Sequence, residues 1–367
     1  MRNILVVDLG KSYGGAEKYV EQLTEMGKGV FNFFFLVRKN SLLEQKLLKY
    51  QVHCKILSIN FSKMTFPNDL YNTIKFIKKY HISIMHTNGI NSEFFISIIR
   101  FLLMDKAIKY ITTVHGIAEY DRMQSNELKK LVFAKLQVRL IENFNNIIAV
   151  SNSIKEDLIK KGIERKKIVI IYHGIKPRYT LPQYRIHNPF RICSIGRLEK
   201  VKNISLLVWA LNEIRLDKNI DYCCDIYGSG NEYETLKALI EELGLDDKIK
   251  LKGYAQNVED VYSKHDLLVQ PSIYESFGFT ILEAMNAGVP VLCSNVGGMA
   301  EIVKDEVNGL LFDINSVHEL ANKISECIQN KYDLITIRKR AFQTLCQNYT
   351  LEITRNKTYE IYDRQWS

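Results

Sequence analysis

The stretch LLVQPSIYESFGFTILEAMNAGVPVLCS, residues 267–294, decides the fold because strand-like and helical runs alternate within it. Residues 267–270 form an apolar run that ends at Pro271, and residues 291–294 form a second apolar run. From Phe279 onward the intervening residues have helical character. Near-continuous apolar runs joined by helical stretches are typical of parallel strands that are buried on both faces. The stretch therefore predicts a strand–helix–strand unit.

The same alternation extends along most of the chain. The strand-like runs are ILVVD, FNFFFLV, ISIMHT, IKYITTV, NNIIAV and IVIIY in the first half, and FRICSI, DYCCDIY, KIKLKGY, HDLLVQ and PVLCS in the second. A chain of 367 residues has room for two domains of ~100–200 residues each. We expect an α/β protein with two doubly wound, Rossmann-like parallel-sheet domains that face a central cleft, with the ligand in that cleft.

The segment KPRYTLPQYRIHNP, residues 176–189, separates the two sets of strands. It carries three of the six prolines and has no hydrophobic periodicity, which is typical of a linker. We predict an N-terminal, acceptor-binding domain over residues 1–176, a linker over 177–189 and a C-terminal, nucleotide-binding domain over 190–348. Residues 349–367 are expected to form a C-terminal helix, and a return of this helix to the N-terminal domain is one alternative.

Composition places the chain among soluble globular proteins, since 46% of its residues are apolar and 25% are charged. Residues 94–104 form the most apolar helix candidate, but Arg100 interrupts it and it falls short of the ~20 residues of a membrane span. The start of the chain lacks the features of a signal peptide. Seven cysteines without a CxxC spacing suit buried thiols in a reducing compartment. We expect a cytoplasmic protein.

Positive charge is concentrated in the first half of the chain. Residues 1–180 hold 29 Lys and Arg against 15 Asp and Glu, a net +14, and the remainder holds 21 against 26, a net −5. The basic residues lack the aromatic interleaving of a single-strand binder, so nucleic acid is not expected. An anionic membrane surface or a phosphate-bearing acceptor fits better. The helix candidate LKKLVFAKLQVRL, residues 128–140, is expected either to lie on such a membrane or to pack on the sheet.

Several loops after the predicted strands have features of an anion site. Gly14 and Gly15 form a tight loop before a helix, which indicates either an anion at the helix N-terminus or an ordinary strand–helix turn. Arg197 and Lys202 lie five positions apart after another strand, and such a pair suits either two phosphates or a solvated face. A weaker signal is the glycine turn at residues 228–230.

Two glutamates, Glu275 and Glu283, lie eight positions apart in a largely apolar run. Glu275 is expected in the turn before a helix and Glu283 one to two turns into it, so both carboxylates can line one crevice. Each carboxylate needs a polar partner, which is water, a salt-bridge partner or a ligand. The turn at Gly253–Tyr254 follows another predicted strand and is grouped with the same site.

Four short motifs occur together in this chain. They are GGAE at residues 14–17, GRL at 196–198 followed by Lys202, ESFGFTILE at 275–283, and AMNAGVPV at 284–291. Together they resemble the family-4 retaining glycosyltransferases of the GT-B fold, also called glycosyl transferases group 1. The resemblance extends from Ile4 to Asn348, and the combination is specific although each motif alone is not.

The resemblance implies roles for two cations and one histidine. Arg197 and Lys202 are expected to hold the diphosphate of a nucleotide sugar, with help from the backbone of Gly15. His115, in TTVHG, matches the family histidine near the reacting sugar. His115, Arg197, Lys202 and Glu275 are therefore predicted to be catalytic.

The resemblance also implies how the donor is held. Glu275 is expected to contact the hydroxyls of the donor sugar, beside the backbone amides of Phe277 and Gly278. Glu283 is expected to bind the ribose hydroxyls, and Gly253–Tyr254 to border the base. Sugar hydroxyls then solvate both carboxylates. The alternatives are a helix-dipole partner for Glu275 or a salt bridge for Glu283.

Three residues depart from the family pattern. Asn88 stands where a second histidine is frequent, and His173 replaces the asparagine that usually precedes Gly174. Asn203 follows Lys202 where glycine is common. The first two departures leave the details of the acceptor side open.

The implied activity is transfer of a sugar, with retention, from a nucleotide diphosphate sugar to a glycan acceptor. Metal-dependent transferases usually present an Asp-x-Asp pair, and no two aspartates lie two positions apart, so neither a metal nor another cofactor is expected. A UDP-sugar is favoured over GDP-mannose. The acceptor is expected to be lipid-linked, in the synthesis of bacterial O-antigen, lipopolysaccharide or capsule. Alternatives are a sugar-nucleotide epimerase or hydrolase, and a catalytically silent regulatory subunit.

Overall fold

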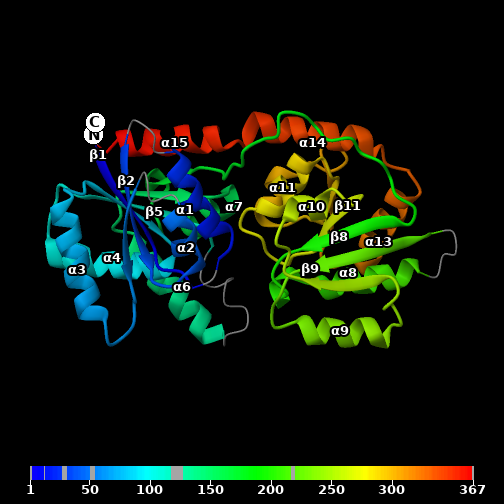
Figure 1. Cartoon of the computed structure of the whole chain (residues 1–367), viewed down its shortest axis with the longest axis horizontal. Coiled ribbons are helices and arrows are strands. Elements are labelled where there is room, and N and C mark those ends of the chain that lie inside the picture. The colour runs from blue at the N-terminus through cyan, green and yellow to red at the C-terminus, as the bar shows by residue number, and fades with distance from the viewer. Residues whose placement is uncertain are drawn as a thin grey trace. The chain divides into compact units, whose positions relative to one another are not determined.

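The computed structural model describes residues 2–11, 13–26, 31–49, 54–116, 127–215 and 220–365. The chain folds into two compact units. The first unit comprises residues 1–173 together with 351–367, and the second comprises residues 174–350. Both units are drawn in Figure 1.

The first unit is built on a sheet of seven parallel strands in the order β3-β2-β1-β4-β5-β6-β7. Their bounds are β1 Arg2–Asp8, β2 Phe31–Arg38, β3 Lys55–Ile59, β4 Ile84–Asn88, β5 Lys109–Val114, β6 Asn146–Ala149 and β7 Ile168–Ile170. The order reverses between β1 and β4. In open parallel sheets, ligands bind beside such a reversal, at the carboxyl ends of the strands.

Helices cover both faces of the first sheet. They are α1 Gly15–Met26, α2 Leu42–Lys49, α3 Phe66–Lys79, α4 Ile90–Leu103, α6 Glu127–Ile141, α7 Asn152–Lys160, the 3-10 helix η1 Arg165–Lys167 and α15 Leu351–Asp363. One hydrophobic core joins the sheet to α1, α2 and α15, through residues such as Tyr19, Leu43 and Tyr362. A second core joins the other face to α3 and α4, through residues such as Ile77 and Phe95.

The second unit is built on a sheet of six parallel strands in the order β10-β9-β8-β11-β12-β13. Their bounds are β8 Phe190–Ile195, β9 Tyr222–Tyr227, β10 Ile249–Gly253, β11 Leu267–Gln270, β12 Val291–Ser294 and β13 Leu310–Phe312. This order reverses between β8 and β11. The loops that follow β8 and β11 therefore flank the expected ligand crevice of this sheet.

Helices cover both faces of the second sheet as well. They are η2 Lys200–Lys202, α8 Ile204–Ile214, α9 Tyr233–Glu242, α10 Val258–Tyr262, α11 Phe279–Ala287, α12 Gly297–Ile302, α13 Val317–Ile328 and α14 Leu334–Asn348. Figure 1 shows α8 and α9 on one side of β8 and β9, and α10 and α11 on the other. A hydrophobic core joins the sheet to α8, α9 and α13.

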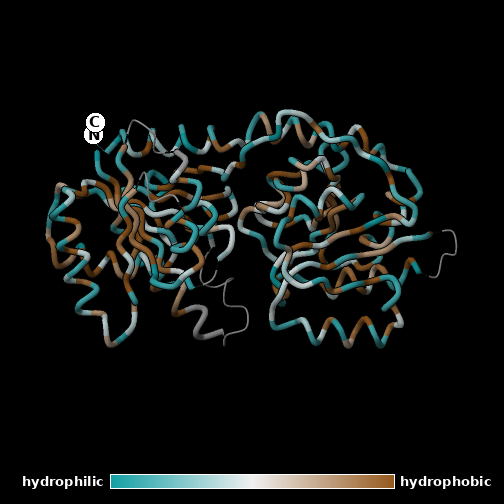
Figure 2. The backbone as a smooth tube through the Cα atoms, in the orientation of Figure 1, coloured by the Kyte–Doolittle hydropathy of each residue, from teal (hydrophilic) through white to brown (hydrophobic). Residues whose placement is uncertain are grey.

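The fold class predicted from the sequence is confirmed in each unit, because every strand pair is parallel and helices alternate with strands. In Figure 2 the strands of the first sheet are largely brown, the colour of hydrophobic residues. In β1, for example, Ile4, Leu5, Val6 and Val7 are at most 1% exposed. Two short strands, β3 and β13, were not predicted.

The segment predicted as a linker, residues 177–189, contains neither helix nor strand, yet it belongs to the second unit. Its side chains and backbone bond to that unit. The Arg178 amide donates to Asn286 Oδ1 at 2.8 Å, and Tyr184 donates to the Asp266 carbonyl at 2.9 Å. The contacts divide the chain after His173 rather than after residue 176.

The C-terminal helix α15 belongs to the first unit, whereas α14 belongs to the second. Tyr362 of α15 is fully buried, and its ring packs edge-on against Phe31 and His86 of the first sheet. The hydroxyl of Tyr362 also bonds to His86 Nδ1 at 2.6 Å. The end of the chain is therefore part of the core of the first unit.

Candidate active site

The loops that follow β8 and β9 are fitted closely to each other by two glycines. A Cβ added at Gly228 would overlap the carbonyl oxygen of Gly196, and one at Gly230 would overlap that of Leu198. Both glycines have positive φ, at 144° and 159°. The Leu198 amide also donates to the Ser229 carbonyl at 2.9 Å. The glycine turn that was a weak signal in the sequence thus fixes the loop that carries Arg197 and Lys202.

Each of the two cations predicted to bind the diphosphate pairs with a carboxylate. Arg197 Nη1 lies 3.0 Å from Glu199 Oε1, and the Arg197 side chain is 56% exposed. Lys202, at the end of η2, pairs through Nζ with Glu275 Oε2. The Lys202 and Glu275 side chains are 17% and 20% exposed, so this pair is largely shielded from water. The structure therefore places Glu275 against Lys202, and Arg197 in the same loop.

Asn203 occupies a position that requires an unusual backbone conformation. Its φ of 51° and ψ of 38° lie in the left-handed region, between η2 and α8. Asparagine tolerates this region better than other residues with a Cβ. This conformation explains why Asn203 can stand where glycine is common in the family.

The loop that carries Glu275 is held by a second pair of glycines. A Cβ at Gly297 would overlap the carbonyl oxygen of Glu275, and one at Gly298 would overlap the backbone of Phe277. The Gly298 amide donates to the Glu275 carbonyl at 2.8 Å. Gly278, with a φ of 119°, is the N-cap residue that precedes α11. Gly297 and Gly298 were not predicted, although a glycine pair separated by two residues from the end of a strand is a readable signal.

Glu283 lies on α11, in the fifth position of that helix, as the sequence predicted. The single hydroxyl hydrogen of Tyr262 in α10 has two acceptors within reach, the Thr280 carbonyl at 3.1 Å and Glu283 Oε2 at 3.5 Å. Burial, and then the Glu283 carboxylate, raise the pKa of Tyr262 well above its usual value. Tyr262 therefore acts as a neutral donor that orients Glu283.

The turn after β10 joins the same edge of the sheet. The Gly228 amide donates to the Gly253 carbonyl at 2.8 Å, which ties this turn to the one after β9. Gly253 has a φ of 70° with open space where a Cβ would lie, and Tyr254 is 72% exposed. An exposed aromatic ring at this place is available for stacking on a base, which leaves the predicted role of Tyr254 open to test.

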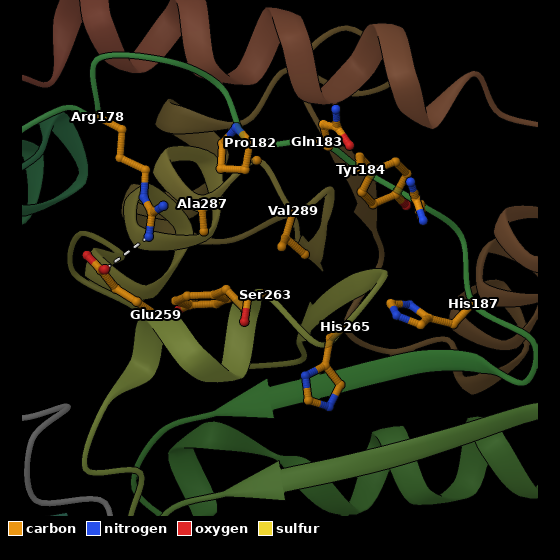
Figure 3. A pocket seen from close by; sticks show the side chains of 13 residues that line it. Arg178, Pro182, Gln183, Tyr184, His187, Glu259, Ser263, His265, Ala287 and Val289 are labelled. Atoms are coloured by element: carbon orange, nitrogen blue, oxygen red, sulfur yellow. Dashed lines mark hydrogen bonds and ion pairs between the residues drawn. The ribbon is translucent and has the colours of Figure 1, made fainter.

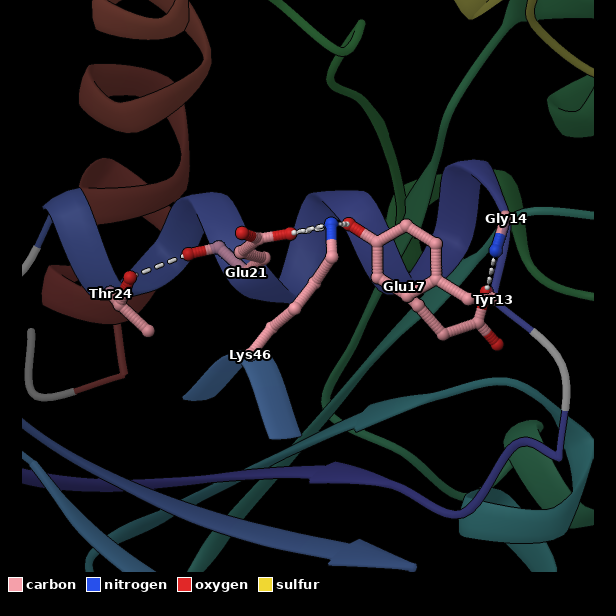
Figure 4. A network of polar contacts seen from close by, with 6 residues as sticks. All are labelled: Tyr13, Gly14, Glu17, Glu21, Thr24 and Lys46. Carbon is pink, nitrogen blue, oxygen red and sulfur yellow. Dashed lines mark hydrogen bonds and ion pairs between the residues drawn. The ribbon is translucent and has the colours of Figure 1, made fainter. Parts of the chain in front are cut away.

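In the first unit, a side chain of α1 bonds to the backbone at the start of this helix (Figure 4). The Gly14 amide donates to Glu17 Oε2 at 2.9 Å, and the Glu17 carboxylate lies over Gly10. Further along α1, Lys46 of α2 donates to Glu21 Oε2 at 3.2 Å and to the Tyr13 hydroxyl at 2.9 Å. Gly15 is the first residue of α1, so its amide lies at the helix N-terminus as predicted.

His115 lies just beyond β5 and is bonded on both sides. Its Nε2 bonds to Asn88 Oδ1 at the end of β4, and its Nδ1 bonds to His173 Nε2 at 3.0 Å. The Tyr19 ring of α1 packs against both imidazoles, with centroid distances of 5.5 and 4.8 Å. Asn88 and His173, two of the three residues that depart from the family pattern, are therefore hydrogen-bonding neighbours of His115.

Burial keeps these imidazoles neutral at physiological pH. It lowers the pKa of His173 to about 3, and it lowers the pKa of His115 well below its usual range, with smaller effects of His173 and His86. Burial acts in the opposite sense on Asp8, whose pKa is raised despite its hydrogen bonds to Asn88 and Gly10. An uncharged His115 can donate or accept a hydrogen bond but brings no positive charge to a ligand.

The described residues contain no group of three or more His, Cys, Asp and Glu that could hold a metal ion. Among the same residues, no helix is both long and apolar enough to span a bilayer. A pocket of about 250 Å³ lies elsewhere in the second unit, where residues 182–185 and His187 run past α10 and the end of α11 (Figure 3). It contains none of the predicted site residues.

Family models match both parts of the chain. Residues 13–179 match the model described as Glycosyltransferase Family 4, and residues 181–344 match the model described as Glycosyl transferases group 1. The chain belongs to the group 1 glycosyltransferases. Within residues 181–344 of this glycosyltransferase lie four of the predicted site residues, Arg197, Lys202, Glu275 and Glu283.

Two curated relatives illustrate the similarity of this glycosyltransferase to others. It is 34% identical to the uncharacterized glycosyltransferase MJ1607 of Methanocaldococcus jannaschii over 45% of this chain and 46% of that protein. It is 26% identical to the UDP-Gal:alpha-D-GlcNAc-diphosphoundecaprenol alpha-1,3-galactosyltransferase of Escherichia coli, over 74% of this chain and 73% of that one. The match to the first relative thus spans about half of its length.

A solved structure shows the same fold. The Anabaena HepE protein, in a crystal structure with UDP-glucose, is 19% identical to this glycosyltransferase and superposes with a TM-score of 0.84. The superposition covers 99% of this chain and 100% of that one. Its two α/β units are therefore those of the GT-B glycosyltransferases.

Proposed function

We propose that this glycosyltransferase moves a sugar from a UDP-sugar, with retention, to a lipid-linked glycan in the synthesis of a bacterial surface polysaccharide. Two similarities support UDP. The relative from Escherichia coli is named for a UDP-Gal donor and a diphosphoundecaprenol acceptor. The Anabaena neighbour was crystallised with UDP-glucose.

The pairing of Lys202 with Glu275 is the observation that carries the proposal. An ammonium that is only 17% exposed, and is held against a carboxylate, occupies a place that favours negative charge nearby. Phosphate oxygens of a donor offer the same kind of partner, and Arg197 adds a planar fork five residues away. With phosphate on Lys202, the Glu275 carboxylate becomes available to accept hydrogen bonds from the sugar hydroxyls.

The reaction then consists of one exchange of bonds at the anomeric carbon. The bond between this carbon and the β-phosphate oxygen breaks, and its electron pair goes to that oxygen. The acceptor hydroxyl oxygen forms its bond to the carbon on the same face, and its proton passes to the departing phosphate. Arg197 and Lys202 stabilise the negative charge that develops on the diphosphate, because they are in place before the bond breaks.

We propose that no metal takes part, because two cations and the amides at the start of α11 serve the diphosphate. Turnover is therefore expected to persist in excess EDTA at the rate measured without it. The initial rate with and without EDTA, and after addition of Mg²⁺ or Mn²⁺, is the measurement. Loss of turnover in EDTA that either ion restores would show that a metal is required.

The proposed acceptor is inferred from the charge of the first half of the chain. A net +14 over residues 1–180 suits an acceptor that carries phosphates or lies on an anionic membrane. On α6, Lys135 and Arg139 are exposed beside the apolar side chains of Val132 and Leu136. The side chains of Lys129 and Lys130, also part of the predicted basic helix, lie outside the described residues.

Thermal unfolding with a panel of nucleotide sugars tests the proposed donor. A ligand that binds only the folded state raises the midpoint by mass action. UDP-glucose, UDP-galactose or UDP-N-acetylglucosamine is expected to raise the midpoint of unfolding more than GDP-mannose. A larger shift with GDP-mannose would contradict the assignment of UDP.

A product assay separates transfer from the alternative reactions. With a UDP-sugar and a diphosphoundecaprenol-linked acceptor, UDP is expected to appear only together with the elongated lipid. Formation of free sugar or an epimerised sugar without acceptor would favour an epimerase or hydrolase. Absence of any turnover with every donor would favour a regulatory subunit.

A further inference from the structure

Four polar side chains form one chain of hydrogen bonds at the carboxyl edge of the first sheet. Asp8 ends β1, Asn88 ends β4, His115 follows β5 and His173 follows β7. Asn88 Nδ2 bonds to Asp8 Oδ2, Asn88 Oδ1 to His115 Nε2, and His115 Nδ1 to His173 Nε2. Asp8, Asn88 and His173 are 3%, 4% and 2% exposed. Only His115 is half-buried, so it is the member that a ligand can reach.

The partners of Asn88 determine where the protons lie. Asn88 Nδ2 faces the Asp8 carboxyl, and it also lies 3.3 Å from the Ala16 carbonyl oxygen. A carbonyl oxygen can only accept hydrogen bonds. The amide nitrogen therefore faces these oxygens, and Oδ1 faces His115. An amide oxygen can only accept, so His115 Nε2 carries the proton. In the neutral ring Nδ1 is then an acceptor, and His173 Nε2 must donate to it.

We propose that Asn88 and His173 are matched positioning residues that fix the tautomer and orientation of His115. This inference rests on the proposed transferase function, because it concerns how the histidine is presented to the substrate. Asn88 Oδ1 accepts the hydrogen bond from the His115 Nε2–H, and the His173 Nε2–H donates one to His115 Nδ1. The two side chains bond to the two nitrogens of the same ring.

The two side chains are matched to each other in both hydrogen bonding and volume. Exchanging them would place an imidazole at position 88 and an amide at position 173. Either side chain can donate to Asp8 while it accepts from His115 at position 88, and either can donate at position 173. Exchanging one alone, however, leaves the site with one ring too many or too few. Close-packed interiors tolerate volume-conserving changes best.

A double-mutant cycle tests the proposal. The variants are Asn88→His, His173→Asn and the double exchange Asn88→His with His173→Asn. Each single exchange is expected to lower kcat by about tenfold or more, with the KM for donor within about twofold, because the reacting groups are misplaced. The double exchange is expected to recover kcat to within about threefold of the parent chain. A double exchange whose loss equals the product of the two single losses overturns the proposal.

The tautomer of His115 is measured directly by nitrogen-15 NMR of the imidazoles, with His115→Gln to assign the resonance. The parent chain and the double exchange are expected to show a neutral His115 with its proton on Nε2. A proton on Nδ1, or a charged ring at pH 7, overturns the proposal. As a control, His265→Asn changes a buried histidine that bonds to the Val261 carbonyl in the second unit, and it should leave the His115 resonance unchanged.

Failure of the transferase function gives a different pattern of results. If the parent chain turns over no nucleotide sugar, the proposed function is wrong. The positioning claim is then still decided by the tautomer of His115 and by the thermal stability of the parent chain, the two single exchanges and the double exchange. Compensation then appears as a midpoint of unfolding for the double exchange that lies above both single exchanges. A midpoint below both contradicts the claim. His173→Phe, which keeps a ring but removes the donor, is expected to change the His115 resonance even if it folds well.

Discussion

Gly228 shows how one missing side chain controls the geometry around Arg197. A Cβ at this position would overlap the Gly196 carbonyl, and the residue has positive φ. The added methyl group would push away the loop that carries Arg197. We predict that Gly228→Ala therefore weakens UDP binding by tenfold or more, which corresponds to a loss of ~1.4 kcal/mol of binding free energy. Gly162→Ala is the control, because Gly162 also has positive φ, 98°, but open space around it.

Calorimetry with UDP and thermal unfolding of both variants distinguish two effects of the added methyl group. One is backbone strain at positive φ, and the other is overlap with the Gly196 carbonyl. Both substitutions are expected to lower the midpoint of unfolding, because an L-residue is strained at positive φ. Only Gly228→Ala is expected to lose UDP affinity. Equal UDP affinity in Gly228→Ala and the parent chain would show that the loop contact does not shape the site.

Some partners at the residue scale can be read from the sequence and others cannot. Glu199 lies two positions from Arg197, so its pairing with that cation is within reach of sequence reasoning. Lys202 and Glu275 are 73 positions apart, and only the folding of the second sheet brings them together. The sequence therefore predicted both residues but missed that the cation and the carboxylate pair with each other.

Helix α6 combines exposed basic and apolar side chains, which suits a membrane surface. Val132 and Leu136 are 57% and 40% exposed, beside exposed Lys135 and Arg139. We predict that the double variant Lys135→Glu with Arg139→Glu binds anionic vesicles at least about thirtyfold more weakly, since each basic residue near such a surface contributes ~1 kcal/mol.

Sedimentation with phosphatidylserine-containing and neutral vesicles at low salt is the measurement for α6. The control is Lys237→Glu with Lys331→Glu, which makes the same charge change at two exposed lysines of the second unit. It is expected to bind like the parent chain. Equal binding of the parent chain to neutral and anionic vesicles would contradict a role in membrane attachment.

The two strands that sequence analysis missed share a position at the edge of a sheet. β3, Lys55–Ile59, ends the first sheet, and β13, Leu310–Phe312, ends the second. An edge strand is covered on fewer sides, so its residues need not form a long apolar run. β3 is only partly buried and β13 is three residues long. The interior strands, by contrast, were all predicted.

At the scale of the whole molecule, the first unit is expected to lose stability in mild acid. His86, His115 and His173 have lowered pKa values, to about 3 for His86 and His173, because they are buried. Unfolded histidine has a pKa of ~6.5, so unfolding takes up protons below this pH and stability falls as the pH drops. Glu93, with its pKa raised to about 7, and Asp8, with a raised pKa, oppose this trend.

Three imidazoles outnumber two carboxyls, so the net effect between pH 6.5 and 5 is destabilising. Each net proton taken up on unfolding costs ~1.4 kcal/mol per pH unit. Hydrogen exchange of β4 and β5, corrected for intrinsic rates, is expected to show a falling opening free energy over this range. The strands β11 and β12 of the second unit serve as the internal comparison. A constant or rising opening free energy of β4 and β5 would contradict the assignment of neutral imidazoles.

The central claim is that Lys202 and Glu275 separate when the donor binds, the cation going to phosphate and the carboxylate to the sugar. Glu283, oriented by Tyr262, is assigned to the ribose. UDP contains the phosphates and the ribose but no donor sugar. UDP is therefore expected to gain affinity from a contact with Glu283 and none from a contact with Glu275.

Calorimetric titration of UDP into the parent chain, Glu283→Ala and Glu275→Ala tests this division most directly. Glu283→Ala is expected to weaken UDP by about one to two decades, since hydrogen bonds to a charged group contribute roughly 1.5–3 kcal/mol. Glu275→Ala is expected to bind UDP as tightly as the parent chain or more tightly, because Lys202 loses its carboxylate partner, while its turnover falls. If Glu275→Ala weakens UDP as much as Glu283→Ala does, the proposed exchange of partners at Lys202 is wrong.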